Sequence, residues 1–118
     1  MALKSIDHVN EDDRMAECID NCFEAAQVCE WCADECVGMG DEEMARCIRL
    51  CRDVADVATL HARFMARNSG YHADLAATCA DLCEECANVC AKFDHDHCQA
   101  CVDVLRECSN SCRDMASA

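Results

Sequence analysis

The sequence of 118 residues contains no proline, only three glycines and few aromatic side chains. The absence of proline removes the strongest interruption of helices, and the scarcity of glycine leaves little flexible backbone. Alanine, aspartate and glutamate are abundant among the other residues. This composition favours helix over strand, so we predict an all-α protein.

Long apolar stretches are also missing. No run approaches the roughly 20 apolar residues that a membrane-spanning helix needs. The N-terminal residues 1–18 lack the continuous apolar region of a signal peptide. We therefore expect a cytoplasmic protein with reduced thiols and no role in a membrane.

Positive charge is scarce, because 10 lysines and arginines face 24 aspartates and glutamates and give a formal net charge of −14. Such a surface repels nucleic acid and anionic lipid. We expect no nucleic-acid partner, and the acidic residues are explained most simply as a solvated face.

Cysteine is abundant instead, with 15 residues in this short chain. Complete pairing into disulfides is impossible for an odd number, and a cytoplasmic setting disfavours a disulfide scaffold. Free thiols that serve another chemistry are the favoured interpretation.

Three breaks divide the chain into four amphipathic segments. They lie at residues 38–40, 68–70 and 93–96, where glycine or short polar residues gather. The expected helices span 11–37, 41–67, 71–93 and 95–116. Their short connections predict one domain over residues 1–118, an antiparallel up-down four-helix bundle. For residues 1–9, a short extra helix and a frayed arm both stay open.

The stretch CADLCEECANVC, residues 79–90, carries cysteine where an amphipathic helix carries leucine. Steps of three and four recur along every predicted helix, and they place all the cysteines on inward positions. An antiparallel arrangement of the helices predicts that the cysteines form layers across the bundle. The first layer, at one end, holds the cysteines at positions 36, 47, 90 and 98, and the next holds those at 32, 51, 86 and 101. The cysteines at 18 and 112 lie at the far end. The predicted ligands are Cys18, Cys22, Cys29, Cys32, Cys36, Cys47, Cys51, Cys79, Cys83, Cys86, Cys90, Cys98, Cys101, Cys108 and Cys112.

A core lined with cysteine gives up apolar burial that leucine would supply. Soft thiolates select copper(I), zinc or iron–sulfur clusters. Helices present thiols in pairs, which suits copper(I) with its two or three ligands better than closed sets of four. We predict a core that binds many copper(I) ions. A zinc or iron–sulfur protein, including a redox enzyme, is the alternative, and a thiol-redox buffer would need exposed cysteines.

Histidine and methionine gather near both ends of the predicted bundle. Thioether and imidazole are weaker copper(I) ligands than thiolate and suit a mouth that captures ions, although methionine also fills gaps in cores. The candidate ligands at the mouths are His95, His97, Met39 and Met44 at one end, and His61 and Met65 at the other. Apolar residues off the cysteine stripe, Phe23 and Trp31 among them, flank the core or form a subunit interface.

The four cysteine-lined segments, the repeated CxxxC pairs and the motif HDHCQAC at residues 95–101 resemble the cytosolic copper storage proteins. The resemblance covers about residues 11–116. It implies a homotetramer of four-helix bundles that store copper(I) inside each bundle without enzymatic turnover. It also implies uptake at an end that bears histidine and methionine, with copper chaperones as candidate partners. The chain departs from the family pattern in its second helix, where only Cys47 and Cys51 are cysteines.

Overall fold

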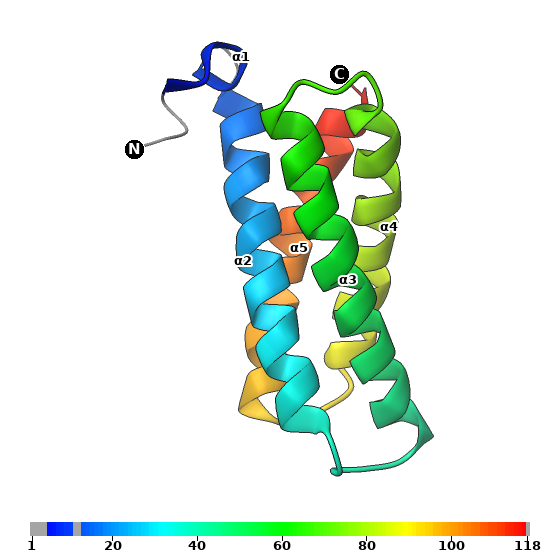
Figure 1. Cartoon of the computed structure of the whole chain (residues 1–118). Helices are drawn as coiled ribbons and strands as arrows, with labels where there is room; N and C mark the ends of the chain where they lie inside the picture. Colours follow the sequence, from blue (N-terminus) through cyan, green and yellow to red (C-terminus); the bar gives the residue numbers. More distant parts are fainter. Residues whose placement is uncertain (1–4, 11–12, 118) are drawn as a thin grey trace.

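The computed structural model describes residues 5–10 and 13–117, and the regular structure within these ranges is helical. The four long helices are α2 (Asp13–Cys36), α3 (Glu42–Ala66), α4 (His72–Cys90) and α5 (Asp96–Ser117). They run up and down as an antiparallel bundle in which each helix packs against two neighbours, α2 and α4 being diagonal (Figure 1). The predicted fold class is confirmed.

The helix boundaries follow local signals. Asp41 caps α3, because its Oδ1 accepts a hydrogen bond from the backbone N–H of Met44 at 3.1 Å. The helix α4 ends at Cys90, three residues earlier than predicted, because the N–H groups of Lys92 and Phe93 turn to the carbonyls three residues back. Other predicted boundaries agree with the structure within one or two residues, and residues 11 and 12 lie outside the described ranges.

A short helix, α1 (Asp7–Asn10), precedes the bundle. Val9 is 1 % exposed and joins the core, and His8 Nε2 lies 2.8 Å from the carbonyl oxygen of Met65. Of the two alternatives for residues 1–9, the described part therefore adopts the short extra helix, packed against one end of the bundle (Figure 1).

The bundle has two different ends. We call the end with the α2–α3 and α4–α5 connections the His97 end. The opposite end, with α1 and the α3–α4 connection, is called the Met65 end. No helix in the described part of the chain is long and apolar enough to cross a bilayer.

Candidate metal centre

All fifteen cysteines point into the bundle as free thiols, and none is more than 1 % exposed. Each long helix contributes its stripe because the steps of three and four keep the cysteines on one face. The inward orientation predicted from the sequence is confirmed.

Nine of these cysteines form overlapping groups in the half of the bundle nearer the His97 end. Within each group the sulfurs lie within 4.8 Å of one another. Cys47 and Cys90 approach to 3.6 Å, as do Cys51 and Cys86. We call these nine the outer compartment; its groups are Cys32–Cys36–Cys47–Cys98, Cys32–Cys51–Cys90–Cys101 and Cys29–Cys51–Cys86.

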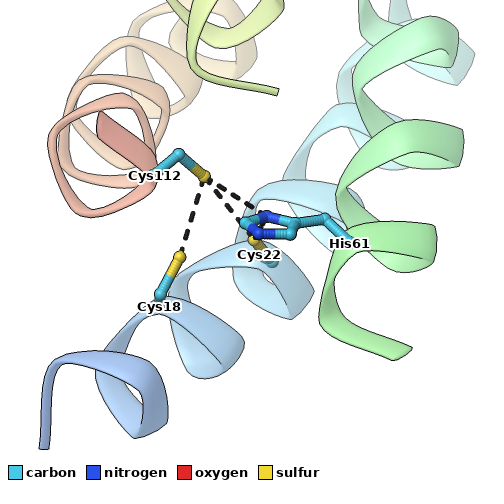
Figure 2. A group of neighbouring side chains, drawn as sticks. All are labelled: Cys18, Cys22, His61 and Cys112. Carbon is cyan, nitrogen blue, oxygen red and sulfur yellow. Dashed lines mark hydrogen bonds between the residues drawn. The ribbon is translucent and has the colours of Figure 1, made fainter. Parts of the chain in front are cut away.

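Two further groups lie toward the Met65 end. Figure 2 shows His61 of α3 pointing between Cys22 of α2 and Cys112 of α5. Its Nδ1 is 3.5 Å from the Cys22 sulfur and 3.6 Å from the Cys112 sulfur. We call the residues of these groups the inner compartment; the groups are Cys18–Cys22–His61–Cys112 and Cys22–Cys79–Cys108–Cys112.

The observed groups of cysteines differ from the flat layers predicted from the sequence. Cys90 was expected beside Cys36 in the end layer, yet it completes the group with Cys32, Cys51 and Cys101 while also touching Cys47. Residues on four helices are offset along the axis by fractions of a turn, so a thiol can serve two neighbouring layers. Cys22, Cys32, Cys51 and Cys112 each belong to two groups.

The protonation of the thiols depends on burial and on their neighbours. Burial raises the pKa of Cys36 to about 12, and burial also raises the pKa of Cys98. Hydrogen bonding from Cys112 lowers the pKa of Cys18 to about 4. The Cys36 and Cys98 thiols are therefore neutral at pH 7 and must release protons when a metal binds.

At the His97 end, the candidate ligands of the predicted entrance lie beside the outer compartment and differ in exposure. His97, 8 % exposed, has its Nε2 3.4 Å from the Cys36 sulfur. The exposed His95 ring stacks on His97 with centroids 5.3 Å apart. A depression of about 190 Å³ at this end is lined by Cys36 and Met44 among others, and Met39 is exposed nearby.

The Met65 end is different, because His61 and Met65 are both fully buried. Met15 and Met115 are buried there as well, and α1 packs against this end. His61 thus lies beside thiols in the interior rather than at an opening, and its role as a ligand stays a prediction.

One neighbour of His97 was missed by the sequence analysis. Trp31 packs edge-on against His97 with ring centroids 6.0 Å apart. Its position on α2, next to Cys32, gave no signal of this contact, because the path of the α4–α5 connection brings His97 to it.

An all-α bundle with overlapping groups of buried thiols defines a protein class that binds soft metal ions within its core. The family model for copper storage proteins matches residues 11–117. This chain belongs to the copper storage protein family.

Individual proteins that resemble this chain are consistent with its assignment to the family. The cysteine-rich protein YhjQ of Bacillus subtilis strain 168 is 38 % identical over 101 residues, 85 % of this chain and 94 % of that protein. The apo structure of copper storage protein 3 from Bacillus subtilis superimposes with a TM-score of 0.79 at 39 % identity, covering 86 % and 97 % of the two chains. A cytosolic copper storage protein from Streptomyces lividans, solved with five coppers, gives 0.81 at 32 % identity over 90 % and 94 %.

Proposed function

We propose that this chain stores copper(I) as cargo in the cytoplasm, bound by its fifteen core cysteines, without enzymatic turnover. The observation that carries the proposal is the sharing of Cys22, Cys32, Cys51 and Cys112 between neighbouring groups. Bridging sulfurs suit clusters of copper(I), whereas closed tetrahedral zinc sites take four ligands each.

Anaerobic titration of the reduced protein with copper(I), in the presence of a competing chelator, tests this function. We expect a capacity between about seven ions, for two private thiolates each, and about one ion per cysteine. Saturation near one ion per four thiols with zinc, and no tight copper(I) binding, would favour the zinc protein instead. A brown colour would indicate an iron–sulfur cluster.

The shared thiols provide a matched pair of variants. Cys32 belongs to two groups and Cys86 to one. Cys32→Ala is expected to lower the copper capacity more than Cys86→Ala, because it removes a bridging sulfur from both groups. Equal losses would argue against bridging.

We further propose that copper enters at the His97 end, along a path from exposed His95 and Met39 to His97 and Met44 and then to Cys36. The graded exposure of these ligands and the 3.4 Å approach of His97 to Cys36 support it. His97→Ala should slow uptake from a chaperone or a chelate and leave the capacity unchanged. His8→Ala, which removes an imidazole at the opposite end, is the control.

For the assembly we propose the homotetramer, with the outer face of α2 and α3 as an interface. A hollow of about 640 Å³ on this face is lined by Phe23, Leu60 and other residues, and both side chains are at least 40 % exposed. The α4–α5 face is charged by contrast, with Arg113 paired to Glu84. Phe23→Glu should reduce the mass measured by light scattering, and Asn88→Glu on α4 should not.

A further inference from the structure

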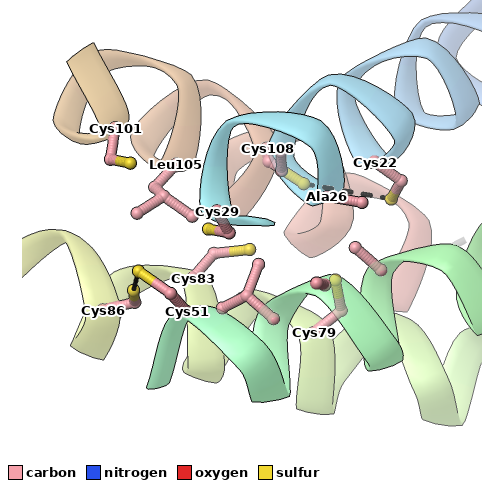
Figure 3. Close-up of a cluster of buried hydrophobic side chains, with 14 of the residues drawn as sticks. Cys22, Ala26, Cys29, Cys51, Cys79, Cys83, Cys86, Cys101, Leu105 and Cys108 are labelled. Carbon is pink, nitrogen blue, oxygen red and sulfur yellow. Dashed lines mark hydrogen bonds between the residues drawn. The ribbon is translucent and has the colours of Figure 1, made fainter. Parts of the chain in front are cut away.

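The outer and inner compartments together account for fourteen cysteines, and Cys83 belongs to neither set of groups. It lies at mid-height of α4, and the corresponding stretches of α3 and α5 carry the buried apolar residues Ala55, Ala58 and Leu105. Along α5, Leu105 separates Cys101 from Cys108, and Leu105 is fully buried (Figure 3). The thiol lining is therefore interrupted by an apolar belt.

The interruption is long on three helices. At about 1.5 Å of rise per residue, the seven-residue gaps from Cys22 to Cys29 and from Cys101 to Cys108 each span about 10 Å. The gap from Cys51 to His61 on α3 spans about 15 Å. Ala25 and Ala26 on α2, and Ala55 and Ala58 on α3, occupy the belt and offer no ligand atom.

Only on α4 does the row of inward-pointing cysteines continue through the belt. Cys83 lies one turn from Cys86 of the outer compartment and one turn from Cys79 of the inner compartment, with rises of about 4.5 Å and 6 Å. Figure 3 shows this order along α4. The neighbouring thiols Cys108 and Cys79 of the inner compartment raise the pKa of the Cys83 thiol.

We propose that Cys83 is the relay thiol through which copper(I) passes between the outer and inner compartments. The inference rests on the proposed storage function and on uptake at the His97 end. An ion held by Cys86 forms a bond to the Cys83 sulfur, and its bond to Cys86 then breaks. The proton of Cys83 passes to the released sulfur, and copper stays in the +1 state throughout. A second exchange of the same kind delivers the ion to Cys79.

Two side chains report on the compartments separately. Trp31 contacts His97 at the outer end, so its fluorescence follows filling of the outer compartment. His61 faces Cys22 and Cys112, so the NMR signals of its labelled ring follow copper in the inner compartment. Both are recorded against time after the reduced full chain is mixed with a copper(I) chelate.

The decisive variant is Cys83→Ala, with Val54→Ala as the control that removes a buried apolar side chain of α3 and no thiol. In Cys83→Ala we expect the Trp31 response at the normal rate and the His61 response slowed about tenfold or more, a factor that corresponds to about 1.4 kcal/mol of added barrier. In Val54→Ala the His61 response should keep its rate. Adding Leu105→Cys to Cys83→Ala creates a ladder on α5 and should restore the fast response, which separates loss of a relay from a folding defect.

Equal His61 rates in Cys83→Ala and Val54→Ala would overturn the relay while leaving storage intact. A failed rescue by Leu105→Cys in a folded variant would also count against it. If the wild-type chain took up no copper(I), the Trp31 and His61 responses would both be absent, and the storage function itself would fail. Should Cys83→Ala not fold, Leu105→Cys alone must accelerate the His61 response.

Discussion

At the scale of single residues, His61 has surroundings that suit a metal ligand better than a free imidazole. Its Nδ1 faces two sulfurs, and its Nε2 is buried without a hydrogen-bond partner among the described residues. A buried polar atom left unsatisfied costs about 1–3 kcal/mol. The metal-free bundle carries this cost, and a bond from Nδ1 to copper would offset it.

His61→Leu is therefore expected to stabilise the metal-free protein and to weaken its binding of copper at the Met65 end. The gain in the free energy of unfolding should be about 1–3 kcal/mol, because the unsatisfied nitrogen is removed. Denaturant unfolding of the reduced apo protein measures the first effect, and chelator competition near saturation measures the second. His95→Leu, at an exposed position, should leave the stability unchanged. Unaltered affinity in His61→Leu would exclude His61 as a ligand.

The sequence predicted the direction of every cysteine but not the surroundings of individual histidines. Cysteine orientation follows from helical periodicity alone, which is local. His61 is fully buried beside Cys22 of α2 and Cys112 of α5, and these contacts between helices are tertiary features. The contact between His97 and Cys36 likewise depends on how the α4–α5 connection turns.

At the scale of secondary-structure elements, the α2–α3 connection shapes the His97 end, where we propose that copper enters. Gly38 has a φ of +81°, a left-handed conformation that follows the last turn of α2. The N–H of Met39 bonds to the carbonyl of Cys36 at 3.1 Å, so this turn also holds the backbone of the first thiol on the proposed path.

Gly38→Ala is expected to destabilise the apo protein by about 1–2 kcal/mol, because a Cβ disfavours the left-handed conformation. Nothing lies within 4 Å of a Cβ built on Gly38, so the cost comes from the backbone rather than from a clash. Gly70→Ala is the matched control, with equal space and no positive φ. Thermal and denaturant unfolding compare the two, and equal effects would show that the turn tolerates a side chain.

Element boundaries were predictable where a capping residue or a glycine marks them, as at Asp41 and Gly38. The early end of α4 was not, because residues 91–93 carry no breaker and their turn is tightened by bonds to carbonyls three residues back. The sharing of cysteines between neighbouring layers was not predicted either. It depends on how far neighbouring helices are shifted along the bundle axis, and the spacing of cysteines within one helix does not determine that shift.

At the scale of the whole molecule, charge limits how copper can be stored. The chain already carries a formal charge of −14. Seven ions held by two thiolates each would add one negative charge per ion and bring the total to about −21, with the new charge inside the core. Unpaired charge in an apolar interior is costly, so shared sulfurs that keep one copper per displaced proton are favoured.

We therefore expect the average number of protons released per bound copper, counted over all ions taken up, to approach one as the bundle fills. The first ions can take two thiolates each and release more, because few charges accumulate at that stage. Weakly buffered titration with a pH indicator measures the release, and electrophoretic mobility measures the charge of the loaded protein. Protein with alkylated thiols is the control and should release no protons. With one proton per ion, the mobility of the full bundle returns to that of the apo protein. A constant release of two protons, with saturation near seven ions, would instead show that the core tolerates the added charge and that its sulfurs do not bridge.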